Sequence, residues 1–383
     1  MVWLSNLRLK SKDPQVRLKA IESMDLEAGD PSRTFDTLAA CLWDEDGQVR
    51  GAAAKALAGL QNERTPELLR PLLWDPCPEA RQGAATALGR LGDSLSTGPL
   101  TGALKDPHPG VRASAAAALR SLGWHPASEE EQALFNIAIG NVKAASFQGE
   151  AAVNPLVSEL TNDTGFSRRA AAEALEGAVD PRRIKPLIAA ANDSEATVRV
   201  SAIHALGKAD GEEVSATLLR ALGDPEWCVR LAATQVLSRR DSPDLVPYFF
   251  APLEDAHFEV RLTATQFLGR FSSPEIVEGL VRRLRDTDSD VRLAAVKGLG
   301  AIADPAAIEG LVLGLVDEER AIRQAAEQSL DHIQPNWAQT EAAQRAGAGL
   351  ETAMMEKPAW VRAAVAQVVA RLQAAAEGPA VVQ

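Results

Sequence analysis

The sequence has few aromatic residues and no long apolar run. Aromatic residues make up 4 % of the 383 residues, and Tyr248 is the single tyrosine. Alanine is abundant, whereas segments rich in Val, Ile, Thr and Tyr are absent, which favours closely packed helices over β-sheets. No apolar stretch approaches the ~20 residues that span a bilayer. We therefore predict an all-α protein without membrane spans.

Cysteine is also scarce, and basic residues are outnumbered by acidic ones. The three cysteines, Cys41, Cys77 and Cys228, form no CxxC pair, which fits free thiols in a reducing compartment. The first twelve residues lack the apolar core of a signal peptide, so we expect a cytoplasmic protein. The net charge of -12 disfavours nucleic acids and anionic membranes as partners, whereas basic segments of other proteins remain possible partners.

Patterns of catalytic or metal-binding residues are missing. None of the five histidines has another at i+4, and residues 257–259 match half of a zinc-deaminase signature without its Pro-Cys-x-x-Cys. Residues 298–303 match GxGxxA, but no strand is expected before them. The basic cluster at residues 282–285 is typical of a solvated helix end. We expect no cofactor, metal or catalytic residue.

An arginine recurs along the whole chain with a period of 31 residues. The spacings between successive copies are 33, 31, 31, 56, 31, 31, 31, 31, 31 and 39 residues. Val or Ile precedes the arginine in nine of eleven copies, Ala follows three residues later in ten, and Leu seven residues later in nine. Positions −1, +3 and +7 form one stripe of a helix, and its central alanine lets two helices approach closely. The arginines are Arg17, Arg50, Arg81, Arg112, Arg168, Arg199, Arg230, Arg261, Arg292, Arg323 and Arg362.

A second helix precedes each arginine helix, as at residues 243–254 and 305–316. Proline after Asp or Ser, as at Pro243 and Pro305, indicates an N-cap followed by the first helical residue. Two helices and two tight turns account for 31 residues. The repeat therefore predicts a right-handed α-solenoid of about eleven helical pairs.

Aspartate stands six residues before the arginine in eight of eleven copies. At a turn before a helix it can accept backbone N–H bonds, and together with the arginines it suggests a ladder of charge-assisted bonds between neighbouring repeats. The predicted ladder comprises Asp75, Arg81, Asp106, Arg112, Asp193, Arg199, Asp224, Arg230, Asp255, Arg261, Asp286, Arg292, Asp317 and Arg323; Asp44 is the remaining aspartate.

The pattern Asp-x5-Arg-x2-Ala-x3-Leu resembles HEAT repeats, in the short form known from phycobilisome lyases, over residues 5–375. The resemblance implies Asp–Arg pairs along the stack and a concave face that binds partners. It also implies a bacterial source, because residues 136–141 are similar to an element of bacterial repeat proteins. The His-Glu pairs of HEAT-like deoxyhypusine hydroxylases are absent.

The 56-residue interval contains a folded insert. Ser128 and Glu131 form a capping box, and residues 134–138 give an apolar helical face before a short helix at about 142–147. We expect an N-terminal arm at 1–123, the insert at 124–150, a second arm at 151–334, a lengthened capping repeat at 335–375 and a disordered tail at 376–383. The insert is either a spacer or a docking element.

Position +5 of the arginine helices should face the groove between the packed positions. We predict a partner-binding stripe there, suited to hydrogen bonding with an extended peptide or a helix; ordinary solvated surface is the alternative. Its members are Lys55, Glu173, His204, Gln235, Gln266, Lys297 and Gln328.

Trp43 and Trp74 stand at equivalent positions of neighbouring repeats, so they should lie near one another on one edge. They are possible anchors for a partner, or they fill a gap between repeats. The chain as a whole suggests a non-catalytic scaffold that binds a protein or peptide. The resemblance to phycobilin lyases gives the alternative, a chromophore lyase or its partner subunit.

Overall fold

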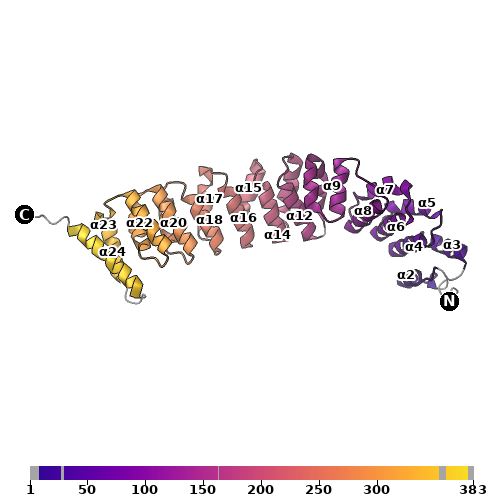
Figure 1. The fold of residues 1–383 in the computed structure, drawn as a ribbon, viewed down its shortest axis with the longest axis horizontal. Coiled ribbons are helices and arrows are strands. Elements are labelled where there is room, and N and C mark those ends of the chain that lie inside the picture. Colours follow the sequence, from indigo (N-terminus) through magenta and orange to yellow (C-terminus); the bar gives the residue numbers. More distant parts are fainter. Residues whose placement is uncertain (1–7, 27–29, 163, 353–358, 378–383) are drawn as a thin grey trace, which may run out of the picture. The chain divides into compact units, whose positions relative to one another are not determined.

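The computed structural model describes residues 8–26, 30–162, 164–352 and 359–377. In these ranges the chain consists of helices joined by short turns, and no strand occurs in them. The chain divides into two compact units, Met1–Ala205 and Leu206–Gln383, each built from helical pairs stacked side by side (Figure 1). The predicted all-α solenoid is confirmed.

Each arginine of the repeat lies in a helix, and these arginine helices form one layer of each stack. Within a unit, consecutive arginine helices such as α4 and α6, or α20 and α22, pack against each other. They are α2 (Pro14–Glu22), α4 (Gly47–Gly59), α6 (Pro78–Leu91), α8 (Pro109–Ser121), α12 (Gly165–Leu175), α14 (Ala196–Leu206), α16 (Trp227–Ser238), α18 (Phe258–Leu268), α20 (Ser289–Ile302), α22 (Arg320–Ile333) and α24 (Ala359–Glu377).

The second layer contains the helices that precede them, here named the leading helices. Most open with a 3-10 turn. They are α3 (Pro31–Cys41), α5 (Thr65–Leu69) with η1 (Arg70–Trp74), η2 (Ser94–Ser96) with α7 (Thr97–Ala103), η3 (Ser146–Ala152) with α11 (Val153–Glu159), η4 (Pro181–Arg183) with α13 (Ile184–Ala190), α15 (Glu212–Ala221), η5 (Pro243–Leu245) with α17 (Val246–Leu253), α19 (Pro274–Arg283), η6 (Pro305–Ala307) with α21 (Ile308–Gly314) and η7 (Trp337–Gln339) with α23 (Glu341–Thr352).

Side-chain caps fix where many of these helices begin. Asp46 accepts the backbone N–H groups of Gln48 at 2.9 Å and Val49 at 3.1 Å at the start of α4. In η6 the Asp304 carboxylate accepts the N–H of Ala306 at 2.8 Å, one residue after Pro305. These bonds satisfy donors that have no partner inside the helix, and proline removes one of the donors altogether.

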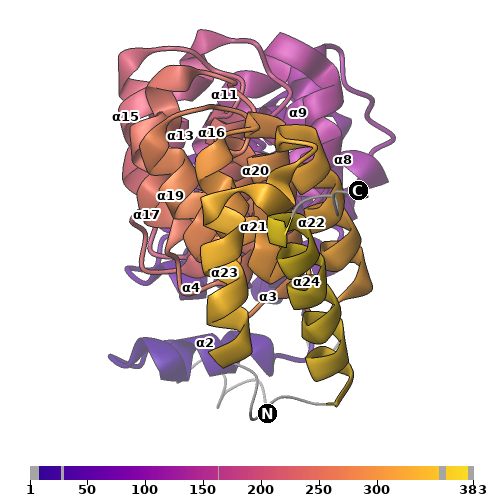
Figure 2. The same ribbon diagram turned by 90° about the vertical axis from the view of Figure 1, so that its left-hand side faces the viewer.

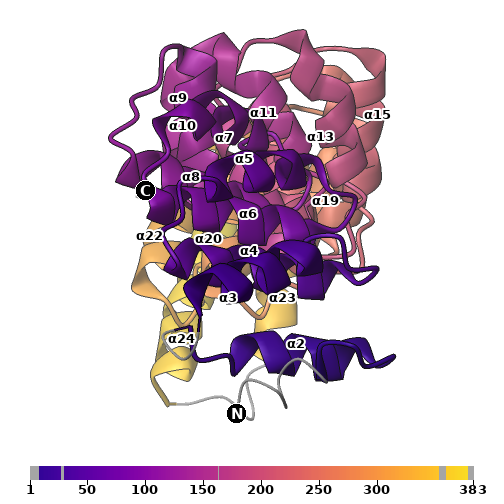
Figure 3. The same ribbon diagram turned by 90° about the vertical axis from the view of Figure 1, so that its right-hand side faces the viewer.

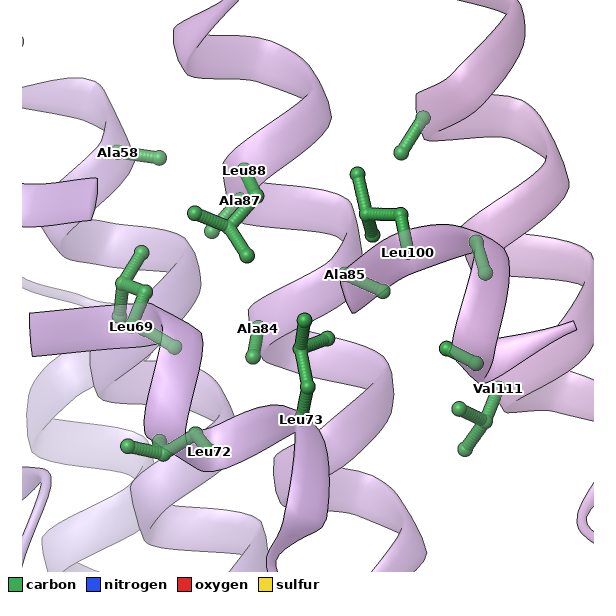
Figure 4. Close-up of a cluster of buried hydrophobic side chains, with 14 of the residues drawn as sticks. Ala58, Leu69, Leu72, Leu73, Ala84, Ala85, Ala87, Leu88, Leu100 and Val111 are labelled. Carbon is green, nitrogen blue, oxygen red and sulfur yellow. The ribbon is translucent and has the colours of Figure 1, made fainter. Parts of the chain in front are cut away.

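The core lies between the two layers. Val49, Ala53 and Leu57, at positions −1, +3 and +7 of one repeat, are fully buried. The buried stripe is wider than the sequence pattern indicates, because position +4 is also fully buried in helices of both units, as at Ala54 and Thr265. Figure 4 shows leucines of η1 and α7 meeting the alanines of α6 in this layer.

Glycines set the closest approach between two arginine helices. A Cβ on Gly83 would lie 2.4 Å from the carbonyl oxygen of Gly51, and one on Gly51 would lie 2.4 Å from that of Glu79. Helices α4 and α6 run side by side through this contact (Figure 3). A side chain at either glycine would therefore push the two backbones apart.

The insert forms α9 (Glu129–Ala138) and α10 (Val142–Ala145) inside the first unit. Leu134, Ile137 and Val142 are buried, with α9 packed on α8 and α10 packed on α12. At the other end, α23 and α24 pack together beside the buried Trp337 (Figure 2). Helix α24 continues to Glu377, so the first two residues of the expected disordered tail, 376–383, are helical, and residues 378–383 lie outside the described residues.

Candidate functional site

Most of the arginines pair with an aspartate of the following repeat, 25 to 27 residues further on. Arg261 is representative: Nε donates to Oδ2 of Asp286 at 2.8 Å, and Nη2 to Oδ1 at 2.7 Å. Its Nη1 donates to the carbonyl oxygen of Asp255, the aspartate of its own repeat, at 2.8 Å. We name this series the arginine ladder; its pairs are Arg17–Asp44, Arg50–Asp75, Arg81–Asp106, Arg168–Asp193, Arg230–Asp255, Arg261–Asp286 and Arg292–Asp317.

Each aspartate also orders its own turn. Oδ1 of Asp286 accepts the backbone N–H of Asp288 at 3.0 Å, and Oδ1 of Asp75 likewise accepts that of Cys77 at 2.8 Å. One carboxylate therefore fixes the start of its own arginine helix and links it to the preceding one.

The paired groups change each other's pKa. Burial raises the pKa of the Asp286 carboxyl, but the bonds from Arg261 and from the Asp288 N–H outweigh it and leave the pKa below its usual range. The hydrogen bond to Asp286 raises the pKa of the Arg261 guanidinium. Both groups are charged at neutral pH, so the bond between them is charge-assisted.

The ladder changes where the insert interrupts the repeat. Arg112 pairs through Nη2 with Oε1 of Glu159 at 2.5 Å, and the two side chains are only 9 % and 6 % exposed. Nε of Arg112 is buried without a hydrogen-bond partner, beside a cavity of about 170 Å³ lined by Lys105, Asn154 and other residues. Burial raises the pKa of Glu159, against the effect of Arg112 and Asn162. Sequence reasoning missed Glu159, because it lies outside the Asp-x5-Arg spacing.

Three further predicted ladder residues take part in the turns before the arginine helices. Arg199 belongs to the first unit and donates to the Asp193 carbonyl at 2.9 Å, while Asp224 belongs to the second and accepts the N–H of Glu226 at 2.9 Å. Arg323 donates to the Asp317 carbonyl at 2.7 Å, and its guanidinium lies 5.5 Å from the ring centroid of Trp360. The position expected to pair with Arg323, residue 356, lies outside the described residues.

A pocket of about 460 Å³ opens on the arginine-helix face of the first unit. Its floor is formed by apolar side chains and small residues, and its rim by charged and polar ones: two cations, two carboxylates and one amide. Lys55 and Glu22, both at position +5, are exposed and contribute to the rim. The lining residues are Leu18, Ile21, Glu22, Met24 and Leu26 from α2 and the turn after it, Gln48, Gly51, Ala52, Lys55, Ala56 and Gly59 from α4, and Glu79 and Arg90 from α6.

The other predicted stripe residues follow the arginine helices. Gln235, Gln266, Lys297 and Gln328 occupy the same position of four consecutively packed helices, α16 to α22; Gln235 is half-buried and the other three are exposed. In the first unit, Glu173 pairs with Arg169 at 3.3 Å, and His204 is half-buried. Of the predicted stripe, Lys55 is the member that lines the pocket described above.

Trp43 and Trp74 point into solvent. They are 81 % and 67 % exposed, so the alternative that they fill a gap between repeats is wrong. In the second unit, Trp227 is 42 % exposed and stacks on His257, with ring centroids 3.8 Å apart and planes 7° apart. His257 therefore takes part in an aromatic contact between two repeats.

Over the described ranges, no group of three or more His, Cys, Asp or Glu side chains is arranged to hold a metal ion. Within the same ranges, no helix has the length and apolar character needed to cross a membrane.

Residues 298–303, which match GxGxxA, lie at the end of α20, where Gly298 and Gly300 meet Gly269 and Ser329 of the neighbouring helices.

The family model for HEAT repeats matches residues 2–77, 67–176, 184–251 and 246–331. These matches cover most of the chain, and they coincide with the stacked helical pairs and the ladder. The chain belongs to the HEAT-repeat family. No curated protein matches the sequence.

Solved structures of other proteins match along most of the chain at low identity. An engineered protein is 20 % identical, with 86 % of this chain and 98 % of that one covered, at a TM-score of 0.41. Human deoxyhypusine hydroxylase is 21 % identical, with coverage of 87 % and 96 % and a TM-score of 0.27. Importin beta is 15 % identical, with coverage of 96 % and 55 % and a TM-score of 0.39.

Proposed function

We propose that the protein is a non-catalytic scaffold that binds a segment of a partner protein on the arginine-helix face of its first unit. The observation that supports this is the 460 Å³ pocket, in which an apolar floor of Leu18, Ile21 and Met24 is surrounded by charged groups. An apolar floor with a few polar groups at its rim suits an apolar anchor residue held in register by hydrogen bonds.

The rim determines which segment fits. Lys55 and Arg90 can pair with carboxylates of the partner, and Glu22 and Glu79 with its cations. The small residues Ala52 and Ala56 leave room for a side chain to reach the floor. We infer a partner segment with a large apolar residue flanked by charges of both signs.

Affinity capture from cells followed by mass spectrometry tests the proposal. The Ala56→Phe variant fills the pocket and should lose the partners captured by the wild-type protein. Ala113→Phe is the matched control: Ala113 is exposed on α8, outside the pocket lining, and this variant should retain them. Equal capture by both variants would exclude the pocket.

A further inference from the structure

The leading helices of the first unit present a second surface, distinct from the pocket. Trp43 ends the turn after α3, and Trp74 is the last residue of η1. They are among the most exposed large apolar side chains described, at 81 % and 67 %. Two indoles exposed to this degree at equivalent positions of adjacent repeats cost solubility without contributing to the core, which is typical of a binding surface.

The arginine ladder holds the two tryptophans near each other. Nη1 of Arg50 donates to the carbonyl oxygen of Asp44, which follows Trp43, at 2.7 Å. Nε of the same side chain donates to the carboxylate of Asp75, which follows Trp74, at 2.8 Å. A single guanidinium therefore bridges the two turns, and we expect the backbones that carry the two indoles to lie about one helix spacing apart, 8–10 Å.

Carboxylates accompany both indoles. Asp36 and Ala40 precede Trp43 on the exposed side of α3, and Glu67 and Pro71 precede Trp74 in the same way. Glu45, two residues after Trp43, has a side chain that is 81 % exposed and that also pairs with Arg17 at 3.2 Å. We name the six exposed residues Asp36, Ala40, Trp43, Glu67, Pro71 and Trp74 the tryptophan face.

Two basic residues of these helices lie at the far end of the face, and the third, Arg70 in η1, is half-buried and paired with Asp93 at 3.0 Å. Arg33 lies ten residues before Trp43, about 15 Å along a helix, and pairs with Asp30 at 3.8 Å. Arg64, at the equivalent position of the next repeat, lies 5.8 Å from the ring centroid of Phe35. The end with the indoles therefore combines π-faces with carboxylates, a combination that attracts cations.

We propose that the tryptophan face binds an extended, cationic segment of a partner protein with basic side chains at positions i and i+3. In the polyproline-II form of an extended chain, three residues make one turn and rise about 9 Å, so side chains i and i+3 lie on one face. This rise is close to one helix spacing, the separation expected for the two turns that carry the indoles. Each basic side chain stacks on one indole, and Asp36, Glu45 and Glu67 supply the opposite charge. Because the tryptophan face lies on the leading helices, this proposal is tested independently of the pocket on the arginine helices.

Binding of the peptide GSRSSRSG to the full-length protein, labelled with ¹⁵N at its seven tryptophans, tests this proposal. At low ionic strength two indole N–H signals should shift, and these should be the signals missing in Trp43→Ala and Trp74→Ala. Each variant should bind about tenfold more weakly. The peptide GSESSESG should bind at least tenfold more weakly to the wild-type protein, because its charge is reversed.

Trp227→Ala is the matched control, because it removes an exposed indole from the second unit and should leave the affinity unchanged. Both tryptophan-face variants should melt at the wild-type temperature, since their indoles contact little. Shifts at other indoles, equal affinity for the two peptides, equal binding by the double variant Trp43→Ala/Trp74→Ala, or absence of binding at millimolar peptide would overturn the proposal.

Discussion

The Arg261–Asp286 pair is the most buried complete pair of the arginine ladder, with side chains 10 % and 2 % exposed. The Arg261 guanidinium makes five hydrogen bonds: two to the Asp286 carboxylate, one to the hydroxyl of Thr287, and two to the carbonyl oxygens of Asp255 and Ala256. They join two consecutive turns. At this degree of burial, the loss of one partner leaves a charge that water cannot reach. The ladder is therefore coupled to the packing of the repeats.

Replacing Asp286 by alanine should lower the free energy of unfolding by about 3–5 kcal/mol, because the Arg261 guanidinium is left buried without its carboxylate. Urea denaturation followed by circular dichroism measures the change. The control is Arg345→Ala, which removes an exposed pair with Glu309 (61 % and 51 % exposed) and should cost less than about 1 kcal/mol. Equal losses of unfolding free energy in the two variants would show that burial does not determine how much a pair stabilises the protein.

Acid should destabilise the ladder. The pKa values of Asp75, Asp255 and Asp286 are lowered in the folded chain, so each contributes stability above the unfolded aspartate pKa of about 3.9 and loses it as the pH falls through the lower folded value. Glu159 acts in the opposite sense, because its raised pKa favours the protonated folded form as the pH falls. Melting temperature measured from pH 6 to pH 2 should therefore decrease mainly below about pH 4. A melting temperature that stays constant over this range would contradict the pKa directions.

Arg50 and Asp75 could be found from the sequence, because each recurs at a fixed place in a 31-residue pattern. Glu159 could not. It reaches Arg112 across 47 residues, since the insert displaces the following repeat and Asn162 occupies the usual aspartate position. The exposure of Trp43 and Trp74 was also beyond sequence reasoning, because an apolar side chain at the end of a helix can pack or protrude.

Among the elements, the contact between α4 and α6 depends on glycine. Gly83→Ala should destabilise the first unit by about 1–3 kcal/mol, because the new Cβ would lie 2.4 Å from the carbonyl oxygen of Gly51. A backbone oxygen cannot move away by a change of rotamer. Gly98→Ala in α7 is the control: it adds the same methyl group where nothing lies within 4 Å and should be neutral or slightly stabilising. Thermal melts of the two variants check the sign of each effect, and equal melting temperatures would contradict the contact.

The insert helices behave as part of the stack in this structure, and a spacer role stays our prediction. Leu134→Ala should lower the free energy of unfolding by about 2–5 kcal/mol, because Leu134 lies on α9, which packs on α8, and is only 7 % exposed. Ile139→Ala in the same segment should cost little, because Ile139 is 46 % exposed. A stable Leu134→Ala variant that loses partner binding would instead identify the insert as a docking element.

The 31-residue period predicts where the helices lie, but it does not predict which of them begin with a 3-10 turn. The sequence predicts one helix over residues 305–316, but the chain forms η6 and then α21, Ile308–Gly314. The cap does not decide the opening, because Asp304 and Asp30 accept the same N–H bond two residues on and only the helix after Asp304 begins with a 3-10 turn. The burial of position +4 was missed because a stripe read from single positions underestimates the width of a packed face.

At the scale of the whole molecule, the repeats form two compact units of one HEAT-repeat chain. Each helical pair contacts chiefly its neighbours, so stability should be distributed along the stack and most protected within the units. The pocket at α2 to α6, the tryptophan face and the insert lie in the first unit. The proposed partner contacts are therefore concentrated there, while the second unit presents the row of amides and Lys297.

The most direct test of the account is site-specific photocrosslinking in cells, with p-benzoylphenylalanine placed singly at Lys55 or at Leu95. Lys55 lines the pocket, whereas Leu95 is 74 % exposed outside the pocket lining and serves as the control. The account predicts a discrete protein adduct from position 55 that disappears when Ala56→Phe is added, and no such adduct from position 95. The absence of an adduct at position 55, or an adduct unaffected by Ala56→Phe, would contradict it.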